Sequence, residues 1–244
     1  MTLSPLSTQA ACLSLCGAIA LGLLPSAVAA SPRAARSAQS ASIFVPPTRE
    51  THSTSRAGGS RNPGGCRHDS AQAVLTAIAP QAQVGLTTAA APKLLVYVPE
   101  TSAQQLYFSV KTASGAGHYE AVVPIAQPDR VVALSLPAEA ALAEGETYSW
   151  GVGLICPSGQ TDMPWAQGKL QRVAARIPLP DTPLDQAIAL GQAGLWYDAV
   201  AALEVARDTA PGPQQSELLR HWSQLLDWTG AAPPATESIL STMF

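Results

Sequence analysis

Charged and aromatic residues are scarce in this chain of 244 residues. Asp, Glu, Lys and Arg make up 13% of it, Phe, Trp and Tyr make up 5%, and Asn62 is the one asparagine. The formal net charge of −3 excludes a protein that coats a polyanion. Nor does the sequence contain a recognisable nucleic-acid-binding module.

The sequence lacks an apolar run long enough to span a bilayer, which takes about 20 residues. The uncharged stretch from Ala10 to Leu24 is shorter and resembles the hydrophobic segment of a secretory signal. Small residues follow it, so we predict a signal peptide over residues 1–30, cleaved after Ala29 or Ala30. The mature chain would then be periplasmic or extracellular, with no transmembrane span. Because Met1 to Gln9 contain no Lys or Arg, an uncleaved N-terminal anchor is the alternative.

Only four cysteines are present, and two of them, Cys12 and Cys16, would leave with the signal. The remaining pair, Cys66 and Cys156, is predicted to form one disulfide in an exported chain. Two unrelated thiols are the alternative. Neither cysteine belongs to a C-x-x-C motif, so redox catalysis is not predicted.

Residues 31–65 have few apolar side chains and are rich in Ser, Ala, Pro, Gly and Arg. We predict a disordered linker, because such a segment buries too little apolar surface to offset its chain entropy. Residues 1–67 hold six basic and one acidic residue (+5), and residues 68–244 hold eight basic and sixteen acidic residues (−8). The basic linker could touch an anionic membrane surface or the acidic body, or it could be a solvated spacer.

Residues 66–177 alternate between apolar and polar side chains. Short alternating runs are separated by Pro and Gly turns, which is typical of antiparallel strands. The runs are Leu94 to Val98, Leu106 to Val110, Tyr119 to Val123, Val132 to Leu136, Tyr148 to Cys156 and Lys169 to Val173. This predicts an antiparallel Ig-like β-sandwich, in a chain that is mainly β with α-helices at its C-terminal end.

Residues 178–230 change to helical periodicity, and 231–244 are predicted to be a flexible tail. Thr182-Pro183-Leu184-Asp185 is typical of a helix start, and the first helix ends at Gly194. A second helix is predicted over Trp196 to Thr209, and a third ends at Gly230. Small and apolar residues of the first pair have the spacing of tetratricopeptide-like helices. A plain helical hairpin packed on the sandwich is the alternative.

Aromatic residues crowd these helices. We consider Trp196, Tyr197, Trp222 and Trp228 as a surface for a partner peptide or envelope protein. The alternative is that they wedge the helices onto the sandwich, since large aromatic side chains dominate core contacts.

No pattern of catalytic or metal-binding residues stands out. His52, His68, His118 and His221 lack the spacing of a metal site and are predicted to be ordinary surface residues. Glu144 and Glu146 flank a turn glycine and are interpreted as solvated acids. The sequence therefore predicts no catalytic residue, no cofactor and no metal ligand.

The order of several short motifs resembles a family known mainly from cyanobacteria, the domain-of-unknown-function family number nine-two-eight. The matching motifs are Arg61 to Cys66, Leu75 to Pro80, Gly85 to Thr88, Pro92, Val96 to Pro99, Leu134 to Pro137, Tyr148 to Trp150 leading to Cys156, and Gly194 to Ala199. The resemblance covers roughly residues 56–230 and implies an exported protein. It carries no activity, but it supports the domain plan and the Cys66–Cys156 pairing.

Three hypotheses for the function follow. The first is a non-catalytic envelope protein that serves as a protein-interaction or scaffold module. The second is an envelope hydrolase that uses loop carboxylates, which requires a deep pocket with two facing acids. The third is a carbohydrate-binding sandwich, which requires a platform of exposed aromatic side chains on the strands.

Overall fold

Strands form where the sequence alternates between apolar and polar residues, and helices follow them. The structure is a computed structural model that describes residues 42–47, 74–156, 164–209 and 211–231. The strands are β1 (Thr76–Ala77), β2 (Gly85–Thr87), β3 (Lys93–Val98), β4 (Gln105–Thr112), β5 (Gly117–Pro124), β6 (Arg130–Ser135), β7 (Thr147–Ile155) and β8 (Trp165–Arg172). A short 3-10 turn, η1 (Ala138–Ala140), lies between β6 and β7. The prediction of a mainly β chain with C-terminal helices is confirmed.

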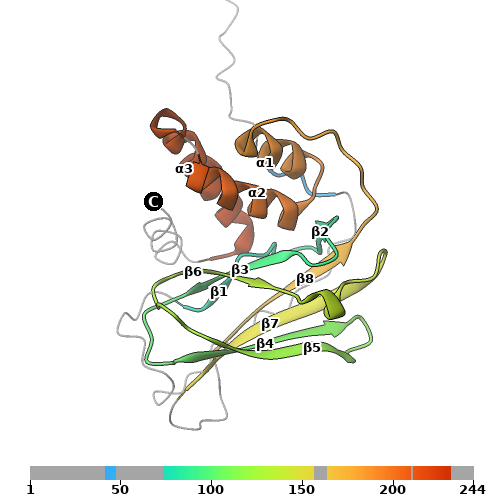
Figure 1. Cartoon of the computed structure of the whole chain (residues 1–244), viewed down its shortest axis with the longest axis vertical. Coiled ribbons are helices and arrows are strands. Elements are labelled where there is room, and N and C mark those ends of the chain that lie inside the picture. Colours follow the sequence, from blue (N-terminus) through green and yellow to red (C-terminus); the bar gives the residue numbers. More distant parts are fainter. Residues whose placement is uncertain (1–41, 48–73, 157–163, 210, 232–244) are drawn as a thin grey trace, which may run out of the picture. The chain divides into compact units, whose positions relative to one another are not determined.

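The described strands form two sheets, which lie one above the other in Figure 1. One sheet has the strand order β1-β3-β6 and the other β2-β8-β7-β4-β5. The prediction of a purely antiparallel fold is wrong in one place, because β2 pairs with β8 in parallel, with Gly85 opposite Leu170. Strand β2 has only three residues, too few to show an alternating pattern, so its pairing follows from packing and not from a local signal.

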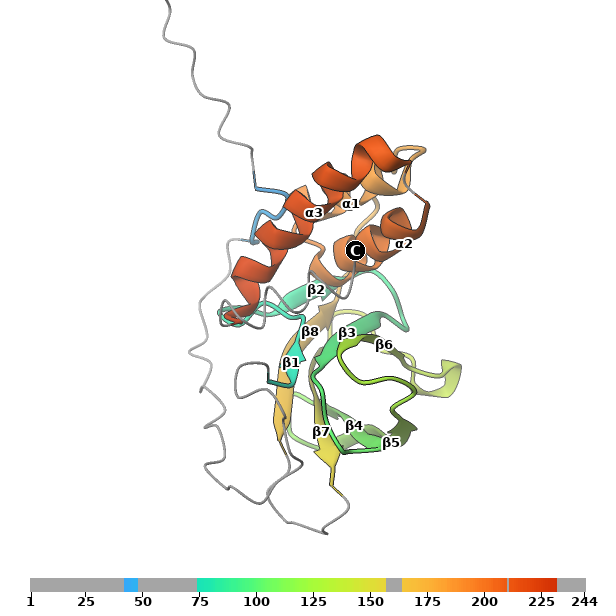
Figure 2. The ribbon, with the colours of Figure 1, turned by 90° about the vertical axis from the view of Figure 1, so that its left-hand side faces the viewer.

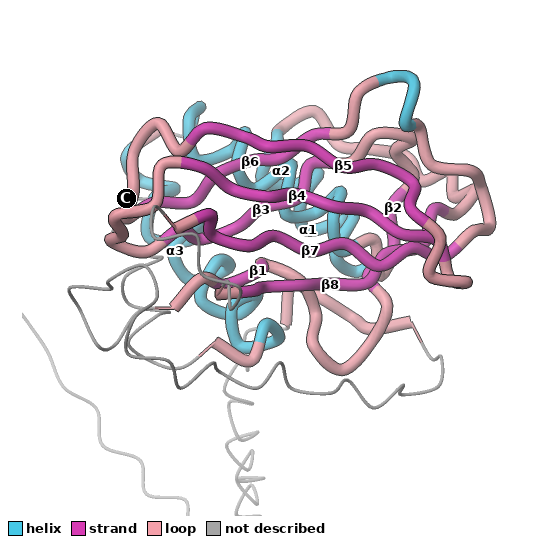
Figure 3. Tube along the Cα trace, turned by 90° about the horizontal axis from the view of Figure 1, so that it is seen from below, coloured by secondary structure: helices cyan, strands magenta, loops and turns pink. Residues whose placement is uncertain are grey.

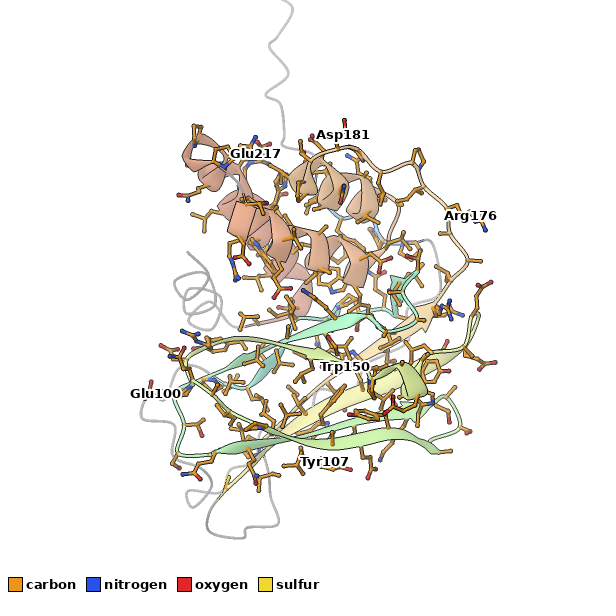
Figure 4. All side chains as sticks on the ribbon, in the orientation of Figure 1. Glu100, Tyr107, Trp150, Arg176, Asp181 and Glu217 are labelled. Carbon is orange, nitrogen blue, oxygen red and sulfur yellow. The ribbon has the colours of Figure 1, made fainter. Side chains whose placement is uncertain are left out.

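The inner faces of both sheets meet in one apolar core. Leu106, Phe108 and Val110 of β4 point into it, together with Trp150 of β7, as the period of two predicts. Figure 4 shows Trp150 between the sheets. The intervening residues of β4 and β7 therefore lie on the opposite side of the five-stranded sheet, which we call the outer face.

Three α-helices follow the sheets: α1 (Pro183–Gln192), α2 (Trp196–Thr209) and α3 (Gly212–Leu226), which continues into the 3-10 turn η2 (Asp227–Thr229). Thr182 caps α1 by accepting a hydrogen bond from the backbone N–H of Asp185, as predicted. Gly194 and Gly230 have φ angles of 76° and 63°, the left-handed conformation that ends a helix. Figure 2 shows the helices on the side of β2 and β3, where α2 contacts both strands.

Residues 42–47 correct the prediction of a disordered linker over 31–65. Ile43 and Phe44 are buried in the core, and Val45 donates a backbone hydrogen bond of 3.1 Å to the carbonyl of Gly191 in α1. We call this segment the N-terminal strap. Two apolar residues give only a weak signal in a linker rich in Ser, Pro and Arg. In the folded protein Ile43 and Phe44 nevertheless pack against the helices. The signal peptide and the rest of the linker lie outside the described residues.

Candidate functional site

The aromatic side chains predicted to form a partner surface are mostly inside the protein. Trp196, Tyr197 and Trp222 are 0%, 1% and 0% exposed. Trp228 is half-buried, and its ring contacts Phe44 of the strap in an edge-to-face arrangement with a centroid distance of 5.4 Å. The first three side chains are therefore not available to a partner. The alternative, that they hold the helices on the sheets, agrees with the contacts of Trp196 and Tyr197.

Two of these residues also form polar contacts between α2 and the sheets. The indole Nε1 of Trp196 donates to the carbonyl of Ile78 over 3.2 Å. The hydroxyl of Tyr197 accepts a hydrogen bond of 2.8 Å from Nε1 of Trp150 and donates one of 3.0 Å to the carbonyl of Lys169. Burial raises the pKa of Tyr197, although the bond from Trp150 lowers it, so this phenol stays neutral.

Asp198 fixes the start of α2 to the end of β2. Its carboxylate accepts hydrogen bonds from the hydroxyl of Thr87, and from both the backbone N–H and the hydroxyl of Thr88. A carboxylate in the first turn also interacts favourably with the helix dipole. The polar residues of this junction are satisfied by each other, so the junction is a structural support.

The histidines do not gather into a site in the described part of the chain. His118 packs on Tyr148 with ring centroids 4.9 Å apart, and its Nε2 lies 3.0 Å from the carbonyl of Ala140. The prediction that His221 is a surface residue is wrong, because His221 lies on the inward face of α3 and is buried. His52 and His68 lie outside the described residues. Within the described ranges, no group of three His, Cys, Asp or Glu residues is placed to hold a metal ion.

The predicted solvated acids Glu144 and Glu146 are exposed in the turn before β7. Cys156 is buried just after β7, with its Sγ 3.7 Å from the carbonyl of Leu154. Its predicted partner, Cys66, lies outside the described residues, so the disulfide stays a prediction.

The outer face of the five-stranded sheet carries two aromatic side chains that the sequence analysis did not single out. Tyr107 of β4, Gly153 of β7 and Trp165 of β8 lie directly opposite one another across three neighbouring strands. Because Gly153 has no side chain, the rings of Tyr107 and Trp165 approach each other, with centroids 6.2 Å apart and planes inclined by 38°. Figure 3 looks onto this face, and Figure 4 shows Tyr107 on the side away from the helices.

A second glycine lets Trp165 lie close against the sheet. A Cβ atom at Gly151 would come within 2.3 Å of Cζ2 of Trp165, so the indole occupies the place of a side chain there. One side of the indole covers the backbone of β7, while the residue stays partly exposed. Its Nε1 donates a hydrogen bond of 3.3 Å to Oε1 of Gln167.

A carboxylate lies beside the other ring. Glu120 of β5 lies on the same face, two residues from Val122, which is the strand partner of Tyr107. Desolvation raises the pKa of Tyr107, and the charge of Glu120 raises it further. Tyr107 therefore presents a neutral phenol on the outer face.

A small hollow opens on β7 and β8 next to this aromatic pair, with a volume of about 80 Å³. Residues from the loop before β2 and from the two strands line it: Pro80, Gln81, Gln83, Ser149, Gln167, Gly168 and Lys169. Gln167 lines the hollow and also accepts the hydrogen bond from Trp165. The amide Nε2 of Gln83 is buried and has no hydrogen-bond partner. The exposed side chains of Ser149 and Gln167 supply the hollow with groups that can both donate and accept hydrogen bonds.

The signal for this face was present in the sequence. Gly151 and Gly153 alternate with large apolar residues in β7, which marks the outer face of that strand as bare. The strand register that places Tyr107 and Trp165 on either side of Gly153 is a tertiary property, so the pair could not be assembled from the sequence.

No helix in the parts of the chain that the structure describes is both long and apolar enough to cross a membrane. No curated protein matches the chain. One solved structure, CopC from Methylosinus trichosporium OB3b, is similar at 13% identity, covering 38% of this chain and 89% of that chain, with a TM-score of 0.27.

A family match covers most of the sequence. The family is described as Domain of Unknown Function (DUF928), and it matches residues 56–239. This range includes the two sheets, the three helices and the residues of the outer face. The chain therefore belongs to the DUF928 family.

Proposed function

We propose that this chain is an exported, non-catalytic envelope protein that binds its ligand through the outer face of the five-stranded sheet. The observation that carries the proposal is the partly exposed pair of Tyr107 and Trp165, next to a hollow, on the side away from the helices. A few aromatic and polar groups gathered around a hollow are typical of a binding site.

In this proposal the helices serve as a scaffold for the sheets. Trp196 and Tyr197 are buried against the strands with their polar atoms paired, so these two side chains are not available to a partner peptide. This moves the predicted interaction surface from the helices to the sheet. The finer classification, an Ig-like sandwich with tetratricopeptide-like helices, belongs to this proposal as well.

A binding role is favoured over an envelope hydrolase by the residues of the hollow. Its described lining contains glutamines, a serine and a lysine but no carboxylate. Glycoside hydrolysis requires a pair of carboxyl groups flanking the substrate. The loop acids Glu144 and Glu146, which the sequence predicted to be solvated, are exposed in a turn.

Export and a Cys66–Cys156 disulfide are parts of the same proposal. Support comes from the Ala-rich segment that ends at Ala29 and Ala30, and from the buried position of Cys156. Mass spectrometry of the mature N-terminus is expected to find the chain beginning after one of these alanines. Thiol labelling of the exported protein is expected to modify neither cysteine, and full labelling of both would exclude the disulfide.

Photo-crosslinking tests the binding face. Val122 of β5 is 52% exposed and lies opposite Tyr107, whereas Leu219 of α3 is 40% exposed. We expect benzoylphenylalanine at position 122 to give a crosslinked product in envelope fractions, and the same group at position 219 to give none. A crosslinked product from position 219 alone would contradict the proposed binding face. A soluble full chain that retains Met1 would contradict the proposed export.

A further inference from the structure

We propose that the ligand of the outer face is a glycan chain, whose sugar rings lie on Tyr107 and Trp165 while their hydroxyl groups bond to the hollow. This inference rests on the proposed function, which identifies the outer face as the binding face, and it adds the chemical class of the ligand.

The two aromatic rings suit the apolar side of a sugar. A pyranose ring presents C–H groups on its faces and hydroxyl groups around its rim, so it combines with flat aromatic surfaces bordered by polar groups. Trp165 lies against the backbone at Gly151, which fixes the indole without using its other face. With centroids 6.2 Å apart, the rings of Tyr107 and Trp165 can contact one short stretch of chain together.

The polar groups around the rings suit hydroxyls. An amide side chain offers both donors and an acceptor, and a hydroxyl group also donates and accepts. The hollow is lined by three glutamines and a serine, of which Gln167 and Ser149 are exposed. A volume of about 80 Å³ admits groups of the size of a few water molecules. Sugar hydroxyls that enter the hollow would bond to the amide of Gln167 and the hydroxyl of Ser149, which are both exposed.

Charge and apolar area argue against other ligands. A nucleic acid needs several Lys or Arg residues for its phosphates, whereas Lys111 and Lys169 on this face are accompanied by Glu120. A stable protein interface has an apolar core and buries about 800 Å² on each partner. Val122 is the one large apolar side chain on the described outer face that is strongly exposed. A neutral, hydroxyl-rich polymer fits this surface best.

The two sources of such a polymer are the cell wall and a secreted polysaccharide, and the experiment separates them. The full chain, with its own N-terminal segment, would be sedimented with purified peptidoglycan sacculi and with insoluble cellulose. Calorimetry would measure its binding to chitohexaose and to cellohexaose. We expect binding to one pair, sacculi with chitohexaose or cellulose with cellohexaose.

Substitutions then place the binding on the outer face. We expect Trp165→Ala to weaken binding about tenfold or more, equivalent to about 1.4 kcal/mol. Gln167→Ala changes a polar side chain without opening the core, and is expected to weaken binding severalfold at an unchanged unfolding temperature. Leu219→Ala, on α3, is the matched control and should bind as the wild type does.

Three outcomes overturn the inference. The first is that the wild type binds none of the four glycans. The second is that Gln167→Ala binds as tightly as the wild type. The third is that Trp165→Ala keeps both its unfolding temperature and the wild-type affinity. If the crosslinker at position 122 captures a protein while no glycan binds, the ligand class is wrong and the proposed function stands. If no product forms at position 122, and glycan binding is unaffected by Trp165→Ala, both fail.

Discussion

The indole of Trp150 in β7 and the phenol of Tyr197 in α2 are joined by a buried hydrogen bond of 2.8 Å. Their rings meet edge to face at a centroid distance of 6.4 Å. Because Tyr197 also donates to the carbonyl of Lys169 in β8, one hydroxyl connects a helix with two neighbouring strands. The helices are thereby part of the same core as the sheets.

Tyr197→Phe removes this hydroxyl while keeping the ring. Nε1 of Trp150 and the carbonyl of Lys169 would lose a partner in a buried place, so we expect a loss of about 1–3 kcal/mol in the free energy of unfolding. Denaturant titration measures it. Tyr107→Phe, at a partly exposed residue of the outer face, is the control and should change stability less. Equal losses in the two variants would contradict the role of the buried bond.

Asp198→Ala removes the acceptor of three hydrogen bonds from Thr87 and Thr88 at the junction of α2 and β2. We expect a loss of about 1–3 kcal/mol, because the donors of a partly buried charge-assisted network are left unpaired. Asp208→Ala is the control, since Asp208 is exposed and forms an ion pair with the neighbouring Arg207. An unfolding curve of Asp198→Ala that overlays the wild type would refute this expectation.

Phe44→Ala tests whether the N-terminal strap belongs to the core. Phe44 packs edge to face on Trp196 and Trp228, so its removal should leave a cavity and cost about 3–5 kcal/mol. Val45, the next residue, is 51% exposed, and Val45→Ala should stay within about 0.5 kcal/mol of the wild type. Thermal and denaturant unfolding would compare the two. If both variants are equally stable, the strap does not contribute to the fold.

Ala199→Leu tests the close packing of α1 and α2. Ala199 is fully buried beside Leu190 and Leu195, so a larger side chain has no room. We expect overpacking to cost about 1–3 kcal/mol in the free energy of unfolding. Val205→Leu, at an exposed position of α2, is the matched control and should be neutral. A stable Ala199→Leu variant would show that the helices are further apart than the structure places them.

His221 predicts a dependence of stability on pH. Burial lowers its pKa, and Arg220 lowers it further, while Glu217 and Gln224 act in the opposite direction. The folded state therefore favours the neutral ring. Its contribution to stability is complete above the unfolded value of about 6.5, and it decreases as the pH falls through the lowered folded pKa.

The measurement compares wild type with His221→Gln at about pH 7.5 and about pH 5. Wild type should lose more unfolding free energy than the variant over this interval, since the variant has no ring to protonate. Carboxylates titrate in both proteins, so the difference between the two losses isolates His221. Equal losses would mean that His221 is protonated as easily in the folded state as in the unfolded state.

Much of the secondary structure could be predicted from the sequence, because its signals are local. The capping pattern at Thr182 and the helix ends at Gly194 and Gly230 were recognisable, and each lies where it was predicted. The alternation of Leu106, Phe108 and Val110 likewise located β4 and its buried side. In contrast, β2 is short and pairs in parallel with a strand far along the chain, for which no local pattern exists.

The sequence by itself determined the mainly β body, the three helices, the buried alternation and the membership of the DUF928 family. It did so because turn residues, caps and hydrophobic periodicity act over a few neighbouring positions. Only the tertiary structure decided that Trp196 and Trp222 are core residues, that Ile43 and Phe44 of the strap are buried, and that Tyr107 and Trp165 meet over Gly153. The physical reason is that burial and strand register depend on which distant segments pack together, and a tryptophan carries the same side chain in either place.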